Sequence, residues 1–458
     1  MKIIILGAGQ VGSSTAESLV NEGNDVTVVD TDSYLLERIQ DRLDIRAVNG
    51  HASSPETLVT AGIEDADMLI AVTQNDEINM VACQVASALF KTPKKLARIR
   101  ASDYVEYPAL FSPEAFAIDV IISPEQLVTA YLQRLIEQPE VLQVVEFFDG
   151  KAQLVAVEVS DESPMAGQPI SKLLDILPDI KMRVAAIFRN NDVIQATGKV
   201  ALQPGDEIFF LALTHHISKL VKVFRHAYKT YERILIAGGG NIGRQLAKRI
   251  ESNHKIKIVE SDAKRARFIA EDLKKTVVLH GDAGDANLLK EENISKIDVF
   301  CAVTNDDEVN ILSAMLAKRM GARKVISIIG KASHVELVRG TSIDLAISPA
   351  QITIGSLLTH IRKGDVVTVH SLRQGAAEAI EVIAHGDFNT SKVVGRHIEQ
   401  IKLPSSASVA AILREGEVLF SDKSLVIAPD DHLIIFISNQ RDIMAVEKLF
   451  QVDFNYLM

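Results

Sequence analysis

Short apolar runs and amphipathic segments alternate from the beginning of the chain. Residues 2–6 and 26–30 are nearly continuous apolar runs, and between them Ala16, Leu19 and Val20 repeat at the spacing of one helix face. Short apolar runs are typical of strands buried on both sides, and the wider spacing is typical of an amphipathic helix. The pattern predicts strand–helix–strand units in a parallel sheet that helices cover on both faces.

The same pattern begins again in the second half of the chain. A strand at 233–237, a helix through Leu246, Ala247 and Ile250, and a strand at 256–260 repeat the first unit. Further matches pair 48–52 with 279–283, 67–73 with 298–304, 76–79 with 307–310, and 121–124 with 346–349. The duplication predicts an α/β fold with two doubly wound parallel-sheet, Rossmann-like domains.

A different pattern follows each of these domains. Apolar stretches at 141–148 and 153–159 flank the turn Asp149-Gly150, which predicts a β-hairpin. The other elements expected here are a helix at 170–176 and strands at 184–188 and 207–211, then strands at 366–370 and 379–384, a helix at 394–401, and strands at 409–413 and 432–437. We therefore expect four domains: Rossmann-like domains at 1–123 and 232–348, each followed by a small α+β domain, at 140–225 and 366–453.

Each Rossmann-like half opens with a glycine motif between its first strand and its first helix. The motif G-x-G-x-x-G comprises Gly7, Ala8, Gly9, Gln10, Val11 and Gly12 in the first half, and Gly238, Gly239, Gly240, Asn241, Ile242 and Gly243 in the second. In dinucleotide-binding folds the glycines allow a tight turn, close approach of the pyrophosphate and close helix–strand packing. Backbone N–H groups at the helix start then bind the phosphates. One motif is weak evidence, but two with intact surroundings favour two nucleotide sites.

An acidic residue ends the second strand of each half. Asp30 and Glu260 lie at the distance from the glycines where a carboxylate accepts hydrogen bonds from a ribose. A carboxylate there repels a 2′-phosphate, so the sequence favours NAD(H), ATP or ADP over NADP.

Polar residues follow the fourth strand of each half. Thr73 ends the run at 67–73 and Gln74 follows it, and Thr304 and Asn305 take the same places in the second half. Ligands bind at the carboxyl ends of strands in doubly wound sheets, so these residues are candidate ligand contacts. Capping of the following helix by Thr73, Asn75 or Asp76 is an equally good interpretation.

Two arginines distinguish the first half from the second. Arg98 and Arg100 alternate within 96–100, which predicts that both lie on one face of a strand. A ligand phosphate would pair with an arginine at a buried strand end. Asp103 or Glu106 could instead form a structural salt bridge. The matching segment 326–330 has no arginine, so we predict that the two sites differ in ligand or affinity.

Composition limits the classes of partner. The 458 residues carry a net charge of −11, which argues against a nucleic-acid partner. Two cysteines suit a reducing cytosol. No window approaches the roughly 18 apolar residues of a membrane helix, and the chain opens directly into a strand, so we expect no signal peptide. Any action at a membrane is expected to go through a protein already there.

Motifs of common catalytic centres are missing from the sequence. No HExxH, nucleophile elbow, Walker A lysine or CxxC pair is present, and the histidines are scattered. The small domains hold no evident acid/base constellation of the kind that a dehydrogenase places over the nicotinamide. We therefore expect no enzyme, no catalytic residue and no metal site.

The shared segments resemble a known family. GAGQVG and GGGNIG, NGHA and HGDA, and the AVT-x-x-DE-x-N pattern of both halves, with ARIR in the first half, resemble regulators of K⁺ conductance domains (RCK or KTN domains). The small domains resemble the C-terminal partner domains of that family. The resemblance covers essentially the whole chain.

The resemblance implies a cytosolic, nucleotide-sensing regulatory subunit on the inner face of a cell membrane. Its partner would be a membrane K⁺-translocating subunit, and the chain would form a homo-oligomeric ring of four copies. Exchange of NAD(H), or of ATP against ADP, would change the ring and gate ion flow. The family's site corresponds here to Gly7–Val11, Asp30, Thr73, Gln74 and Arg98, and in the second half to Gly238–Ile242, Glu260, Thr304 and Asn305.

Two other functions remain open from the sequence. One is an NAD-dependent dehydrogenase with duplicated Rossmann domains. The other is regulation of a different cation channel or antiporter. The sequence does not indicate which nucleotide activates, or which surface contacts the membrane subunit.

Overall fold

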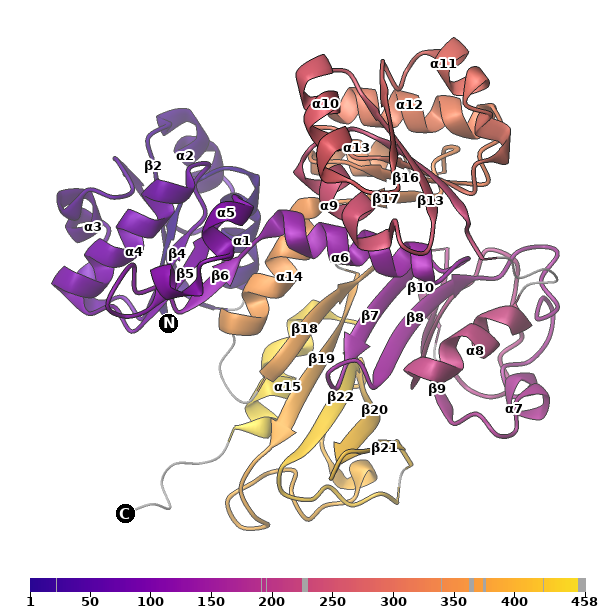
Figure 1. The fold of residues 1–458 in the computed structure, drawn as a ribbon. Coiled ribbons are helices and arrows are strands. Elements are labelled where there is room, and N and C mark those ends of the chain that lie inside the picture. The colour runs from indigo at the N-terminus through magenta and orange to yellow at the C-terminus, as the bar shows by residue number, and fades with distance from the viewer. Residues whose placement is uncertain are drawn as a thin grey trace.

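The computed structural model contains four sheets in the predicted order along the chain (Figure 1). It describes residues 1–21, 23–190, 192–194, 196–224, 230–338, 340–361, 366–373, 376–422 and 424–451. The ends of the two expected small domains, at 225 and 452–453, lie outside these residues. No helix within the described ranges is long and apolar enough to cross a membrane.

The first sheet is parallel throughout and has the strand order β3-β2-β1-β4-β5-β6. Its strands are β1 (Lys2–Leu6), β2 (Asp25–Asp30), β3 (Arg46–Asn49), β4 (Met68–Ala71), β5 (Lys94–Arg98) and β6 (Val120–Ile122). Its helices are α1 (Gln10–Asn21), α2 (Ser33–Gln40), α3 (Pro55–Thr60), α4 (Asp76–Phe90) and α5 (Ser102–Val105). β1 and β4 are apolar and buried because helices cover both faces of the sheet.

The second large sheet repeats this order as β14-β13-β12-β15-β16-β17, again all parallel. Its strands are β12 (Arg233–Ala237), β13 (Lys255–Glu260), β14 (Val277–His280), β15 (Val299–Ala302), β16 (Lys324–Ile328) and β17 (Leu345–Ile347). Its helices are α9 (Asn241–Ile250), α10 (Ala263–Asp272), α11 (Ala286–Glu291), α12 (Asp307–Arg319) and α13 (Ala332–Leu337). The predicted pair of doubly wound, Rossmann-like sheets is confirmed. In both, the strand order reverses beside the glycine-motif strand, where such sheets bind ligands.

The two small sheets are antiparallel, with the orders β10-β9-β11-β8-β7 and β18-β19-β22-β20-β21. The first contains β7 (Gln143–Phe147), β8 (Ala152–Glu158), β9 (Met182–Arg189), β10 (Asp192–Ile194) and β11 (Glu207–Leu213), with helices α7 (Lys172–Ile176) and α8 (Ile217–Val223). The second contains β18 (Val366–Leu372), β19 (Ala377–Ala384), β20 (Ala407–Arg414), β21 (Glu417–Phe420) and β22 (Asp431–Ile437), with helix α15 (Ile443–Phe450).

The helix predicted at 394–401 is wrong. Only a single 3₁₀ turn forms there, at Ile398–Gln400. Gly395 has a positive φ of 76°, which breaks a helix, and His397 instead forms a β-bridge with Val426. A long-range backbone pairing therefore replaces the local helix.

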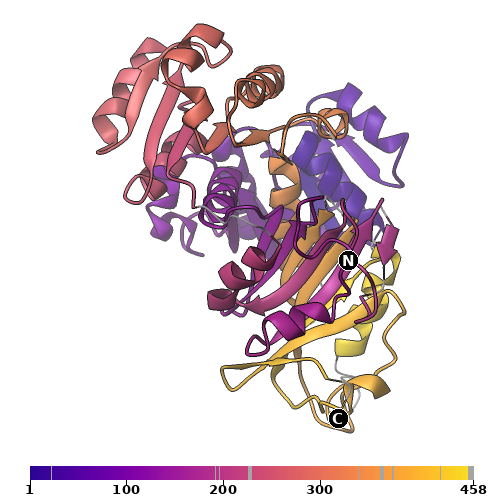
Figure 2. The same cartoon turned by 90° about the vertical axis from the view of Figure 1, so that its right-hand side faces the viewer.

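The two small sheets pack against each other and share one apolar core. Phe147 and Phe209 of the first sheet lie in the same buried cluster as Phe436 of the second. The Arg373 guanidinium adds two hydrogen bonds to the Glu207 carboxylate across this contact, at 3.0 and 3.1 Å. Figures 1 and 2 both show the small sheets side by side, in magenta and yellow. The two halves of the chain are thus joined through their small domains.

Two connecting helices cross between the halves. Helix α6 (Pro124–Glu137) leaves the first sheet, and its Leu132 packs in a core with Leu246 of α9. Helix α14 (Pro349–Ile361) leaves the second sheet, and its Leu357 packs with Leu19 of α1. Each glycine-motif helix is therefore covered by the connecting helix of the other half.

Candidate functional site

The first glycine loop is fixed by contacts that exclude side chains at two of its positions. Gly7 has a φ of 109°, and a Cβ there would lie 3.0 Å from the Thr73 nitrogen. A Cβ on Gly12 would lie 1.8 Å from the Gly7 oxygen, so α1 packs directly on the loop. A Cβ on Gly9 would meet nothing within 4 Å, and this open side faces the start of α1.

The start of α1 offers free backbone donors beside this open position. The first bond within the helix runs from the Ser13 N–H to the Gly9 oxygen, at 2.8 Å. The amides of Gln10 and Val11 therefore have no partner inside the helix. Gln10 is exposed and Val11 is half-buried. The arrangement fits a phosphate at the helix N-terminus.

The second loop repeats this geometry. Gly238 has a φ of 105°, a Cβ on Gly243 would lie 2.0 Å from the Gly238 oxygen, and a Cβ on Gly240 would meet nothing within 4 Å. Asn241 and Ile242 open α9, and the first bond within that helix joins the Arg244 N–H to the Gly240 oxygen at 3.0 Å. Both loops therefore present the same cradle for a phosphate.

The two acids lie beside their loops as predicted from the spacing. The Asp30 carboxylate accepts the Ala8 N–H at 2.6 Å through one oxygen and the Asp32 N–H at 2.9 Å through the other. Glu260 accepts the Gly239 N–H at 2.8 Å and the Asp262 N–H at 2.9 Å. Each carboxylate thus fixes its glycine loop. Both Asp30 oxygens keep a second lone pair that a ribose hydroxyl could use, and in the second half the Glu260 Oε2 does so, because the Glu260 Oε1 also accepts the Ser261 hydroxyl at 3.5 Å.

The middle residue of each loop is matched to the size of the side chains around it. In the first half Ala8 is buried next to Asp30. In the second half a Cβ on Gly239 would lie 2.9 Å from the Glu260 carboxylate and 2.3 Å from the Ile269 Cδ1. In the second half the Ile269 Cδ1, and to a lesser extent the Glu260 carboxylate, therefore leave no room for the methyl group that Ala8 has in the first half.

This match predicts coupled effects of substitution. Gly239→Ala is expected to destabilise the second Rossmann-like domain by about 1 kcal/mol, because the methyl group overpacks the loop. Ile269→Val in the same chain removes the Cδ1 that lies nearest to that methyl group and is expected to restore part of the loss. A double-mutant cycle of urea midpoints measures the coupling, with Gly240→Ala as the control that meets no protein atom. Equal instability of the single and double variants would contradict the size match.

Thr73 and Thr304 form hydrogen bonds with buried asparagines. The Thr73 hydroxyl donates to the Asn79 Oδ1 at 2.7 Å, and the Asn79 Nδ2 donates to the Arg98 carbonyl at 2.9 Å. Thr304 and Asn310 repeat these hydrogen bonds, and the Asn310 amide donates to the Ile328 carbonyl at 3.0 Å. The asparagines join the ends of neighbouring strands. Although the repeated DE-x-N segment was visible, no role for these asparagines was predicted.

The cap of α4 is Asn75, which accepts the Ile78 N–H at 2.8 Å. Asp306 caps α12. Neither Thr73 nor Thr304 is therefore the helix cap, although both lie at the sheet end beside the glycine loops. Gln74 and Asn305 follow them and are exposed. A ligand contact by these residues stays a prediction.

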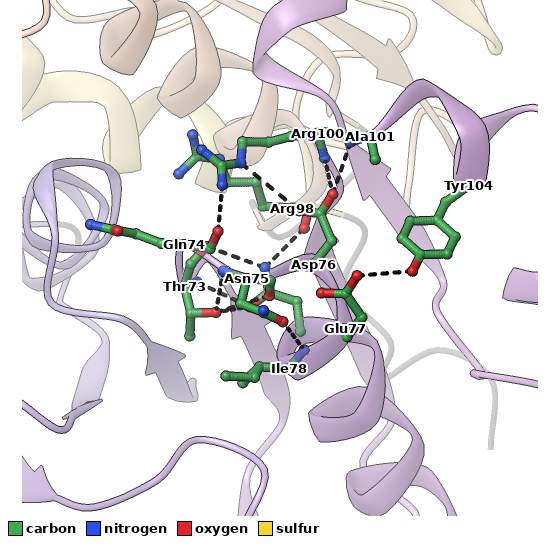
Figure 3. A network of polar contacts seen from close by, with 11 residues as sticks. Thr73, Gln74, Asn75, Asp76, Glu77, Ile78, Arg98, Arg100, Ala101 and Tyr104 are labelled. Atoms are coloured by element: carbon green, nitrogen blue, oxygen red, sulfur yellow. Dashed lines mark hydrogen bonds and ion pairs between the residues drawn. The ribbon is translucent and has the colours of Figure 1, made fainter. Parts of the chain in front are cut away.

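Arg100 lies beyond the strand on which it was predicted. Strand β5 ends at Arg98, so Arg100 belongs to the following loop. Its backbone N–H and that of Ala101 donate to the Asp76 carboxylate, each at 2.8 Å. Its guanidinium donates to the Gln74 carbonyl and lies 4.0 Å from the Asp76 Oδ1 (Figure 3). Asp76 thus holds this loop at the edge of the candidate site.

Arg98 is the half-buried cation of the first site. Its Nε is buried and has no hydrogen-bond partner among the residues that the structure describes, and the same holds for the Asp76 Oδ1 and the Glu125 Oε2. Burial lowers the pKa of the Arg98 guanidinium, and the neighbouring Glu125 carboxylate opposes that shift. Burial also raises the pKa of Glu125, at the start of α6. The Arg98 Nε at the carboxyl end of β5 is a donor that fits a ligand carrying phosphate, whereas the Asp76 and Glu125 oxygens are acceptors and would repel a phosphate.

The second site has different cations. Ile328 and Gly330 stand where the first half has Arg98 and Arg100, and Ile328 is buried. Arg265 of α10 instead reaches the second glycine loop, where its Nε donates to the Gly239 carbonyl at 2.9 Å. Arg265 belongs to the basic run 264–267, which the sequence alone indicates to be a solvated helix face, so its place at the loop was not predicted.

The two sites are close enough for direct contact. The Gln10 side chain of the first glycine loop donates a hydrogen bond to the carbonyl of Gly330, which follows β16 of the second half. The crossing of α6 and α14 places these loops together. The candidate sites thus lie in separate sheets but share a boundary.

The order of the four sheets and the geometry of the two loops define a class of protein. Two Rossmann-like sheets with glycine loops and matched acids, each followed by a small antiparallel domain, are the architecture of a tandem RCK-type regulator. Family models agree with this class: the TrkA-N domain matches residues 3–124 and 234–349, and the TrkA-C domain matches 154–225 and 389–451. The chain belongs to the TrkA family of Trk system potassium uptake proteins.

Curated relatives span the same length. The Trk system potassium uptake protein TrkA of Halomonas elongata is 53% identical over 456 residues, covering 100% of both chains. TrkA of Vibrio alginolyticus is 52% identical over 452 residues, covering 98% of this chain and 99% of that one. A solved structure described as the GsuK channel bound to NAD has a TM-score of 0.61 at 16% identity, covering 98% of this chain and 78% of that chain. This last likeness shows the fold.

Proposed function

We propose that the chain is a cytosolic, nucleotide-sensing regulatory subunit of a Trk-type potassium uptake system. It binds NAD(H), ATP or ADP without turnover and gates K⁺ flux through a membrane subunit. The observation that carries the proposal is the pair of glycine loops, each with an open central glycine, free helix-start amides and an adjacent acid. Membership of the TrkA family and the GsuK channel's bound NAD support it.

The first site would hold its ligand with residues from four strand ends. The loop from Gly7 to Gly12 would bind the pyrophosphate, Asp30 the ribose, and Arg98 and Arg100 the distal phosphate, with Thr73 and Gln74 between them. In the second site the loop from Gly238 to Gly243, Glu260, Thr304 and Asn305 would take the corresponding parts. The ligand would shift the equilibrium between two shapes of the protein only as far as its affinities for the two shapes differ.

The proposal extends to assembly and location. The partner is a membrane K⁺-translocating subunit, and the chain acts as a homo-oligomeric ring of four copies on the cytoplasmic face of the cell membrane. The domain limits at 1–123, 140–225, 232–348 and 366–453 belong to the same proposal. A difference in affinity of about 1.4 kcal/mol at one site shifts the equilibrium between the two shapes about tenfold. Several coupled sites in one ring would multiply that shift.

The sites can be tested separately by calorimetric titration of the full chain with ADP. Asp30→Ala is expected to weaken the first site about tenfold, because a ribose hydroxyl loses its acceptor, and to leave the second nearly unchanged. Glu260→Ala is the matched control and should weaken only the second site. Arg98→Ala should also weaken the first site, and it breaks none of the loop bonds that Asp30 makes. Equal loss at both sites in either acid variant would contradict separate binding.

Gating needs its own measurement. The chain is reconstituted with its co-purified membrane subunit in vesicles, and K⁺ flux is followed as nucleotide is added. A nucleotide response that disappears in the Asp30→Ala, Glu260→Ala double variant supports the proposal. Steady hydride transfer from NADH to a carbonyl compound, or flux that ignores nucleotide, would overturn it.

A further inference from the structure

Arg265 reaches the second glycine loop from the first turn of α10. Asp262 caps this helix and accepts the Arg265 N–H at 2.7 Å. The Arg265 side chain then turns back to the loop, where its Nε donates to the Gly239 carbonyl at 2.9 Å and its Nη2 lies 3.5 Å from the Asn241 Oδ1. The guanidinium therefore lies beside the phosphate cradle, on the side of Glu260.

The first half has an apolar residue at the same position. Asp32 caps α2 and accepts the Leu35 N–H at 3.2 Å, so Leu35 stands where Arg265 stands in the second half. Leu35 is half-buried and packs against the core of its domain. Both residues lie three positions after the capping aspartate of their helix, and their side chains differ in chemistry.

The arginine is not required to shape the loop. The first loop adopts the same turn, with a φ of 109° at Gly7 against 105° at Gly238, although Leu35 cannot donate a hydrogen bond. Arg265 is exposed and uses its Nε for the loop, while an arginine has five N–H donors in a planar fork. The remaining donors lie next to the amides that would bind phosphate, where a guanidinium pairs well with phosphate oxygens.

We propose that Arg265 is a ligand-binding residue of the second site and contacts the phosphate next to the adenosine of a bound adenine nucleotide. The inference rests on the proposed nucleotide-binding function. In the first site the cations, Arg98 and Arg100, lie at the end of β5, away from the ribose acid. In the second site the cation lies on the side of the ribose acid. The first site therefore selects a ligand with distal phosphate, and the second selects one with charge next to the adenosine.

The test compares AMP with adenosine at the second site of the full chain. The background variant is Gly9→Leu, which fills the open side of the first loop without a contact from its Cβ to protein. Arg265→Leu in that background is expected to weaken AMP about tenfold in calorimetry and to leave adenosine unchanged. Arg267→Leu is the matched control: it removes the same charge from the same helix but points to another side, two residues further on.

Each outcome bears on one proposal. If Arg265→Leu weakens AMP and adenosine equally, or weakens neither, the arginine does not contact phosphate and the inference is wrong. If the parent chain binds AMP only at its first site, the inference also fails while the proposed function stands. If the parent chain binds no adenine nucleotide at either site, the proposed function itself fails. Thermal melting of each variant confirms folding, which Leu35 at the equivalent position leads us to expect, and Arg265→Lys should restore part of the AMP affinity.

Discussion

Replacing Gly12 by alanine is expected to abolish nucleotide binding at the first site, with a loss of at least a hundredfold in affinity. The new Cβ would lie 1.8 Å from the Gly7 oxygen and 2.9 Å from its carbon, and backbone atoms cannot move aside as a flexible side chain can. Helix α1 must therefore shift away from the loop, which separates the helix-start amides from the turn. Overpacking of this kind costs about 1–3 kcal/mol or more, and a hundredfold loss corresponds to about 2.7 kcal/mol.

Calorimetry with ADP measures the loss of affinity, and thermal melting measures the loss of stability. Gly9→Ala is the matched control, because its Cβ meets nothing within 4 Å. Gly9→Ala should leave the melting temperature unchanged and weaken only the binding of the ligand, which approaches the loop at Gly9. The second site should bind as before in both variants. Wild-type affinity at the first site of Gly12→Ala would refute the proposed position of the phosphate.

The sequence predicts the two large domains well because their information is local and repeated. The runs at 2–6 and 233–237 are each followed by glycines, and such strand–turn–helix units leave few alternatives. The prediction of a helix at 394–401 failed because the distant residue Val426 forms an isolated β-bridge with His397. The sequence does not predict the crossing of α6 and α14 either, because an amphipathic pattern does not indicate which sheet a helix will cover.

Some residues of the candidate site could likewise be predicted from the sequence, and others could not. Glycines and acids are recognisable because their spacing along the chain decides their positions. The partners of Arg98 and Arg100 depend on how loops from different strands meet, and the structure gives Asp76 to Arg100 where the sequence suggested Asp103 or Glu106. Arg265 shows the same limit: a basic helix face looks solvated until the fold places one of its residues at the glycine loop.

His370 is expected to make the contact between the small domains sensitive to acid. It lies on β18, its Nε2 is 3.0 Å from the Glu146 carbonyl, and its ring meets the Phe147 ring edge-on at 5.0 Å. Burial lowers the pKa of His370 from its ordinary value of 6.5 to about 4; the hydrogen bond to Glu146 opposes this shift, and the nearby Arg134 adds to it. The histidine is therefore neutral in the folded chain at pH 5, while the same histidine is protonated in the unfolded chain.

The sign of the effect follows from this difference. Between pH 6.5 and about 4 the unfolded chain binds more protons at this position, so stability is fully present above pH 6.5 and falls as the pH decreases towards 4. Between pH 7.5 and pH 5 the loss is about 2 kcal/mol at most, from about 1.4 kcal/mol for each pH unit below the unfolded pKa. Part of the side chain meets solvent, which reduces the figure further.

His370→Gln is expected to remove this loss, because the amide can still donate to the Glu146 carbonyl but does not titrate. The urea midpoint for unfolding of the small domains, followed at pH 7.5 and pH 5, measures it. His215→Gln is the control, since His215 is exposed and belongs to the short turn before α8. If the midpoint of His370→Gln falls with pH as steeply as that of the parent chain, the acid sensitivity comes from other groups and His370 does not titrate against the fold.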